Sequence, residues 1–260
     1  MSTRADGRWG GRLTSRPLPE DPSIEGLDPL DRSALAQVWL GRAASERRVA
    51  DSFAVIANAI LELGVDGELR RLAERAIDDE MRHAEISRVV ASRYAGRDLD
   101  APAPLVLETP RHPGAGTPLV HVLHVVGQCC INETIASAFL EAALAHTNAS
   151  LATAALRELF SDEIDHARIG WALLASVDDA TRAAVAARLP AMAIATLRMW
   201  RSSPRTYFER EPFPGHGAPP EAVVEAAFDA AFRDLVIPGF EALGIDAARL
   251  RAWVDDGAPT

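Results

Sequence analysis

The stretches Asp79-Glu80-Met81-Arg82-His83 and Asp162-Glu163-Ile164-Asp165-His166 share one arrangement, a Glu followed three positions later by a His. On an α-helix this spacing places both side chains on the same face, one turn apart. A carboxylate and an imidazole that point the same way form half of a transition-metal site. Two such halves on separate helices predict a dinuclear metal site and a helical fold that brings them together.

The composition indicates a globular protein with an acidic surface. Of the 260 residues 48% are hydrophobic, and the formal net charge is -10. Such a surface repels phosphate backbones and anionic lipids, and we find no uninterrupted apolar run long enough to span a bilayer. We therefore expect neither nucleic acid nor membrane as a partner. The only cysteines, Cys129 and Cys130, are adjacent and form neither a disulfide framework nor a zinc spacing. This predicts a reducing, cytoplasmic location.

Apolar periodicity predicts an all-α fold built on four long helices. Asp66 is a candidate N-cap for the second helix, and Thr117-Pro118 is a start signal for the third. The turns between helices one and two, and between three and four, are short, which predicts two antiparallel hairpins. The four helices are expected at about 33–63, 67–94, 117–146 and 150–176.

The connection over residues 95–116 is long and rich in Pro and Gly. A crossover running the length of a four-helix bundle, as in ferritin-like folds, explains such a loop. Three further helices are expected, at about 178–200, 219–236 and after Asp246, with residues 201–218 covering one end of the bundle. The predicted organisation is an extended or mobile arm (1–30), the bundle (31–177) and a helical extension packed on it (178–260).

A four-helix dinuclear carboxylate site also needs a single Glu from each of the two remaining helices. Glu133 precedes Glu163, and Glu46 precedes Glu80, by similar intervals along each hairpin, and both lie mid-helix in apolar surroundings. Glu62 is the other acid on the first helix, but it lies next to the turn. Because an unpaired buried carboxylate is costly, bound cations explain these positions best. The predicted ligands are Glu46, Glu80, His83, Glu133, Glu163 and His166.

An Asp precedes each Glu of the two repeats. A metal-bound His usually donates its other ring N–H to a carboxylate. In a pseudo-symmetric bundle Asp79 can reach His166, and Asp162 can reach His83. The alternative is that both are exposed helix acids. For the remaining histidines we expect structural or surface roles.

At these residues the chain resembles the ferritin-like di-iron carboxylate superfamily, over residues of about 33–176. The doubled Asp-Glu-x-x-His is similar to the motif of bacterial multicomponent monooxygenases and acyl-carrier-protein desaturases, often Asp-Glu-x-Arg-His. The first copy matches with Arg82, whereas the second has Asp165 in place of Arg. Ser87 stands where radical-forming members carry Tyr, which disfavours a tyrosyl radical. Ser137, one turn after Glu133, matches a hydroxyl common in oxygen-activating members and is a candidate for a supporting role.

The resemblance implies an oxidoreductase, a non-haem di-iron oxygenase or oxidase. It would use two Fe ions, or alternatively Mn or a mixed Mn/Fe pair, to hydroxylate, desaturate or N-oxygenate a small organic substrate. The expected partners are O₂, that substrate and an external electron donor, with a homodimer as the candidate assembly. The alternatives are an iron storage protein of ferritin type with ferroxidase activity, and a manganese catalase or peroxidase. No residue beyond the metal ligands is predicted to be catalytic.

Overall fold

The computed structural model describes residues 13–65, 67–103, 105–202 and 213–256, and these form helices and no β-strand. The all-α prediction is confirmed. The proposed N-cap Asp66 lies outside the described residues, as do residues 1–12 of the predicted arm and 203–212 of the segment expected to cover the bundle end.

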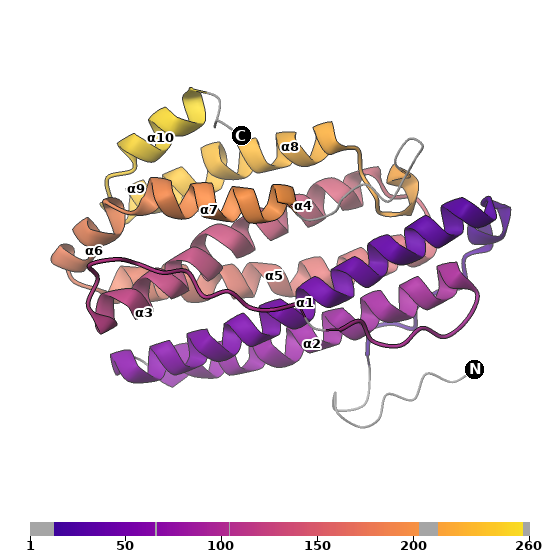
Figure 1. Ribbon diagram of the computed structural model, residues 1–260, viewed down its shortest axis with the longest axis horizontal. Helices are drawn as coiled ribbons and strands as arrows, with labels where there is room; N and C mark the ends of the chain where they lie inside the picture. Colours follow the sequence, from indigo (N-terminus) through magenta and orange to yellow (C-terminus); the bar gives the residue numbers. More distant parts are fainter. Residues whose placement is uncertain (1–12, 66, 104, 203–212, 257–260) are drawn as a thin grey trace.

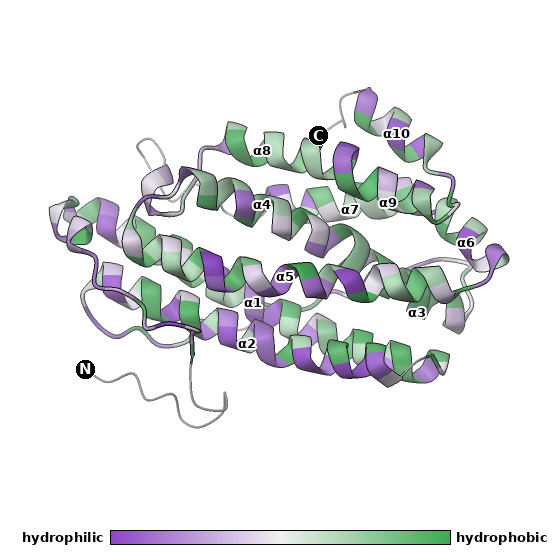
Figure 2. Ribbon diagram, turned by 180° about the vertical axis from the view of Figure 1, so that it is seen from behind, coloured by the Kyte–Doolittle hydropathy of each residue, from purple (hydrophilic) through white to green (hydrophobic). Residues whose placement is uncertain are grey.

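The first two long helices are α1 (Pro29–Leu63) and α2 (Gly67–Ala95), which pack together as an antiparallel hairpin. Helix α1 begins four residues earlier than predicted, because the Asp28 side chain accepts a hydrogen bond from the Leu30 N–H and Pro29 occupies the first turn. It ends at Gly64, whose φ of 65° is left-handed and suits glycine. Figure 2 shows hydrophilic and hydrophobic residues mixed along α2, as expected for a helix with one face in the core.

The third predicted helix is interrupted. It consists of α3 (Thr117–Val125), a π-helical segment η2 (Val126–Asn132) and α4 (Glu133–His146). Helix α5 (Ser150–Ser176) follows after a short turn and packs against α4, η2 and α2. A π-helical turn inserts a residue into a helix and is often found at functional sites. Here the insertion ends directly before Glu133.

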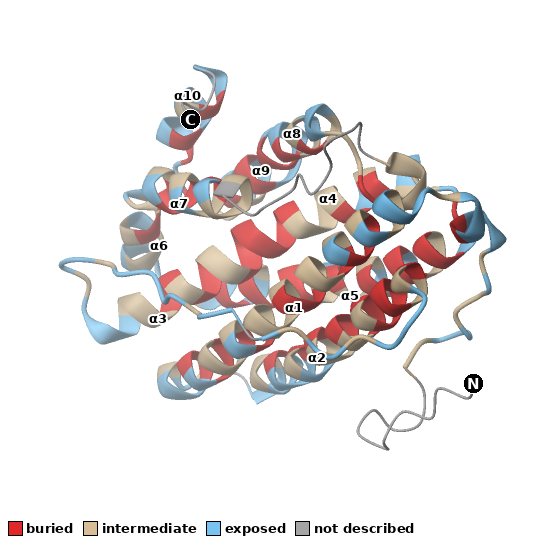
Figure 3. Cartoon of the chain, turned by 45° about the vertical axis from the view of Figure 1, so that its right-hand side comes forward, coloured by how far each residue is buried: buried red, intermediate tan, exposed pale blue. Residues whose placement is uncertain are grey.

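The helices lie in three layers (Figure 1). The α1–α2 hairpin forms one side, α3, α4 and α5 form the middle, and the C-terminal helices cover the other side. The connection between α2 and α3 runs along the length of the molecule, from the far end of α2 to the start of α3 (Figure 1). Buried residues gather on α4 and α5 in the middle layer (Figure 3).

The C-terminal region is more divided than the three predicted helices. The break after α6 falls at Ala187 and Arg188, and a second π-helical segment separates α8 from α9. Phe228, Phe232 and Phe240 of this region share one buried core with Ile131 and Ile135. The elements are α6 (Asp179–Ala186), α7 (Leu189–Ser202), η3 (Pro214–His216), α8 (Glu221–Ala230), η4 (Ala231–Val236), α9 (Ile237–Ala242) and α10 (Ala248–Asp255).

The helical stretch Thr117–His146 is long and apolar enough to cross a membrane by length and composition, although polar residues, among them His124, Gln128 and Glu133, interrupt it. In its most apolar window 61% of the residues are buried inside the protein. A helix at the centre of a three-layered core passes the same test, since neighbouring helices surround it on several sides.

The described part of the N-terminal segment lies against the helices. Its short 3₁₀ helix η1 (Pro22–Gly26) follows Asp21, whose side chain accepts hydrogen bonds from the Ser23 and Leu151 N–H groups. Leu13 and Leu18 pack on the core cluster that contains Trp39. Residues 13–28 are therefore held against α2 and α5.

Candidate metal centre

Six ionisable side chains from four helices converge in the middle of the protein. They form two overlapping groups, and within each group the potential ligand atoms lie within 4.8 Å of one another. Glu80 and Glu163 belong to both groups. The first group adds Glu46 and His83, and the second adds Glu133 and His166. The structure thus brings together all six predicted ligands.

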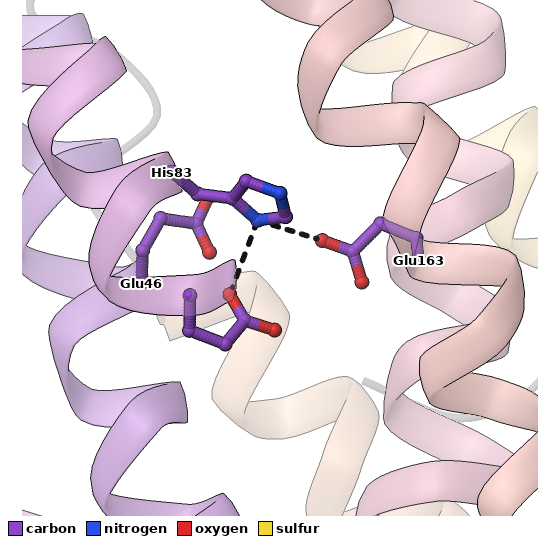
Figure 4. A group of neighbouring side chains, drawn as sticks. Glu46, His83 and Glu163 are labelled. Atoms are coloured by element: carbon purple, nitrogen blue, oxygen red, sulfur yellow. Dashed lines mark ion pairs between the residues drawn. The ribbon is translucent and has the colours of Figure 1, made fainter. Parts of the chain in front are cut away.

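The two shared glutamates each direct one oxygen toward each histidine. His83 Nδ1 lies 3.3 Å from Glu80 Oε2 and 3.6 Å from Glu163 Oε1. His166 Nδ1 lies 3.0 Å from Glu80 Oε1 and 3.4 Å from Glu163 Oε2. Figure 4 shows the His83 ring on the same side as Glu46, facing Glu163 on the opposite helix. Both carboxylates and both imidazoles would therefore be available to hold metal ions.

The burial of these residues, and the hydrogen bonds that they lack, indicate whether they could bind metal ions. Glu46 is partly buried, whereas the exposed fractions of the other five are at most 3%. Both oxygens of Glu80, Oε2 of Glu163 and Nδ1 of both histidines are buried and have no hydrogen-bond partner among the described residues. Leaving a buried polar atom unpaired costs about 1–3 kcal/mol, and more if it is charged. Two divalent cations would pair these atoms and balance the four carboxylates, so the donor set fits them.

Electrostatics shows how strongly the groups interact. Burial, together with Glu80 and Glu163, raises the pKa of Glu46 well above its usual range, and burial with Glu163 and Glu80 does the same to the pKa of Glu133. Burial alone would raise the pKa of Glu80, but contacts with His166 and His83 lower it to about 2. Without cations the cluster is therefore balanced by protons, for which metal ions would compete.

The two histidines also hold protons more strongly than usual. Burial disfavours the charged imidazole of His83, yet its contacts with Asp162 and Glu80 outweigh burial and raise the pKa to about 10. The pKa of His166 is likewise raised, because Asp79, Glu163 and Glu80 outweigh burial.

The sequence predicts that each Asp reaches across to the opposite histidine. His83 Nε2 lies 2.9 Å from Asp162 Oδ2, within hydrogen-bond distance. His166 Nε2 lies 3.7 Å from Asp79 Oδ2, which is too long for a hydrogen bond. Arg82 forms an ion pair with Asp162 and lies 3.8 Å from Asp79, so one guanidinium connects both acids.

A polar network around Glu133 escaped the sequence analysis. Gln128 and Asn132, both in η2, donate hydrogen bonds to Glu133 Oε1. Ser52 donates to Gln128 Oε1 at 2.9 Å, and Trp200 Nε1 donates to Asn132 Oδ1 at 2.9 Å. The network links Glu133 to α1 and to α7. The only sign of this network in the sequence was Asn132 next to Glu133, and an amide residue beside a Glu is too common to predict a hydrogen bond.

Ser137 and the remaining histidines are not members of the two ligand groups. The Ser137 hydroxyl oxygen is buried and has no partner among the described residues. His121 Nε2 lies 2.8 Å from Glu62 Oε2, His146 contacts the Ala142 carbonyl, and His216 contacts Tyr94. None of these histidines joins either ligand group.

Comparison of the chain with models of protein families, with curated proteins and with solved structures gives no match. What is established is thus an all-helical protein with a buried carboxylate–histidine cluster that is capable of binding metal ions.

Proposed function

We propose that this protein is a ferritin-like di-iron oxidoreductase that activates O₂ to hydroxylate, desaturate or N-oxygenate a small organic substrate. The observation that carries the proposal is the set of unpaired atoms at the cluster. Glu80 and Glu163 each offer one oxygen toward each of the two imidazole Nδ1 atoms, and most of these atoms have no other partner.

The chemistry of the ligands favours iron or manganese. Four carboxylates and two imidazoles suit iron or manganese better than zinc or copper, which favour fewer carboxylates. The chemistry that such an iron pair supplies is the reduction of dioxygen coupled to oxidation of the substrate. Six protein ligands shared by two ions leave coordination positions for exogenous molecules.

The residues of the chain have separable roles in this proposal. His83 and Glu46 would hold a metal ion on one side of the cluster, His166 and Glu133 would hold one on the other side, and Glu80 and Glu163 belong to both groups. Asp162 fixes the ring orientation of His83 by accepting a hydrogen bond from its Nε2–H, which leaves Nδ1 available to a metal ion. The described residues contain no cofactor motif for electron delivery, so an external donor is part of the proposal.

Metal analysis and oxygen uptake together test the proposal. We expect about two irons per chain after anaerobic loading with Fe(II), and O₂ consumption when the loaded protein meets air. Glu163→Gln should lose both, whereas Glu62→Gln, which changes an exposed acid outside the cluster, should lose neither. Loading with no iron, or with a single zinc, would refute the site. A closed shell of many chains in size-exclusion chromatography would favour the storage alternative.

A further inference from the structure

One helical turn from the metal centre lies a second set of polar side chains. Arg42 precedes Glu46 by four residues on α1, Ser87 follows His83 by four on α2, and Ser137 follows Glu133 by four on α4. Each therefore stands on the same helix face as a proposed ligand.

These positions lie toward the same end of the bundle because the helix directions alternate. Short turns make α1 antiparallel to α2 and α4 antiparallel to α5. The contacts of His83 with Asp162 and of His166 with Asp79 show that α2 and α5 are also antiparallel. A contact between Arg42 and Phe139, with the guanidinium carbon 5.5 Å from the ring centroid, places α1 and α4 at the same level.

All of these groups present hydrogen-bond donors that are not used. Arg42 Nη1, Ser87 Oγ and Ser137 Oγ are buried and have no partner among the described residues, and the same is true of Trp39 Nε1. Each unpaired buried donor costs about 1–3 kcal/mol. Several of them on one side of the metal centre, one carrying a positive charge, indicate a missing ligand that accepts hydrogen bonds.

The guanidinium of Arg42 is fixed in position. Its carbon lies 4.4 Å from the centre of the Trp39 ring, and Nη2 donates to the Gly217 carbonyl. Burial lowers the pKa of Arg42 to about 10, while nearby Glu46 favours the charged form, so the group remains cationic at neutral pH. Among the described residues no carboxylate forms an ion pair with it.

We propose that Arg42 binds the carboxylate of the organic substrate, with Ser87 and Ser137 as neighbouring donors, so that the enzyme acts on a small carboxylic acid. This inference rests on the proposed function and names its substrate class. A planar carboxylate matches the in-plane N–H groups of a guanidinium whose faces are covered by aromatic rings. Arg42 precedes Glu46 by one helical turn, about 5.4 Å along the axis of α1, and its guanidinium lies beside Trp39 and Gly217, so the substrate would extend from there to the metal centre.

The test measures binding without turnover. Protein loaded with Mn(II) is titrated by calorimetry with acetate, hexanoate and benzoate, each compared with its amide. We expect at least one acid to bind at least about tenfold more tightly than its amide, because only the acid carries the charge. If no acid is preferred over its amide, the proposal is overturned, and this comparison needs no variant.

Variants then assign the preference to Arg42. Arg42→Gln should weaken binding of the preferred acid about 30-fold or more and leave its amide unchanged, with Arg42→Lys intermediate. The matched control is Arg47→Gln, which changes a cation on another face of α1 and should bind like the wild type. Unchanged acid binding in Arg42→Gln would show that the acid binds the metal directly and would overturn the assignment.

The metal content of the same samples separates the two proposals. Two manganese ions per chain without acid preference would refute the role of Arg42 and leave the metal centre intact. Acid binding that depends on Arg42 in protein without stoichiometric metal would refute the metal centre alone.

Discussion

The Nε2 atom of His83 lies 2.9 Å from Oδ2 of Asp162, on a helix that belongs to the opposite half of the site. The equivalent atoms of His166 and Asp79 are 3.7 Å apart. The two halves of the cluster are related in sequence, but their supporting contacts differ in strength.

This asymmetry predicts unequal effects of removing the two acids. Asp162→Asn should lower metal affinity by about 10–100-fold, because the hydrogen bond that orients His83 is weakened. Asp79→Asn should have a smaller effect. Competition with a metal-binding dye measures both affinities, and equal losses would contradict the asymmetry.

His83→Ala removes one of the two imidazoles. We expect stoichiometric metal loading to be lost while most of the helix content remains, since the surrounding helices are held by large apolar clusters. Elemental analysis measures the first and circular dichroism the second. His121→Ala is the control, because His121 pairs with exposed Glu62 away from the cluster. Full loading of the His83 variant would remove this residue from the ligand set.

Gly170→Ala should destabilise the protein. A Cβ at this position of α5 would lie 2.7 Å from Cys129 Cβ and 2.9 Å from the Cys130 backbone nitrogen, so α5 and η2 would have to separate. We expect a loss of about 1–3 kcal/mol in the free energy of unfolding, although Ala normally gains about 1 kcal/mol over Gly inside a helix. Urea denaturation measures the free energy of unfolding. Gly26→Ala is the control, because nothing lies within 4 Å of a Cβ added at Gly26. A stabilised Gly170 variant would show that the two helices separate at little cost.

Acidification should weaken the contact between Tyr94 and His216. The Tyr94 hydroxyl lies 3.0 Å from His216 Nδ1, and burial raises the pKa of Tyr94, so the phenol stays neutral and donates. Burial lowers the pKa of His216 below its usual 6.5. Because the folded pKa is the lower one, the stability contributed by neutral His216 is complete above about pH 6.5 and is lost as the pH falls through the folded pKa.

The measurement is the free energy of unfolding between pH 8 and about pH 5, compared between the wild type and His216→Gln. The difference between the two proteins should shrink as the pH falls. A difference that is constant with pH would show that His216 does not titrate in this range. Using the difference removes the contributions of His83 and His166, which are common to both proteins.

Much of the helical frame was predictable from the sequence, since long apolar periodicity and short turns specify long helices joined as hairpins. The residues of the cluster could be identified because each lies at a fixed spacing from another. The early start of α1 at Pro29 was missed, although Asp28 followed by proline is a start signal.

The interruption between α3 and α4 could not have been predicted. A buried π-helical turn and a buried α-helical turn have the same apolar composition, and apolar periodicity does not separate them over seven residues. The contacts of Gln128 and Asn132 with Glu133 depend on that turn, so they were missed with it. Such contacts arise from tertiary structure and leave no mark in local spacing.

The inserted residue of η2 lets one continuous helix pack against different helices before and after it. Both parts contact α5, but before the insertion α3 also contacts α1 and α6, and after it α4 also contacts α8. One residue corresponds to a rotation of about 100°, so a deletion within Val126–Asn132 that restored regular α-helix would turn one part against the other. Either Glu133 would leave the cluster or α3 would lose its packing. Chain length in this stretch is therefore under tighter constraint than the identity of its apolar side chains. Insertions and deletions should be tolerated less well here than substitutions of one apolar residue by another.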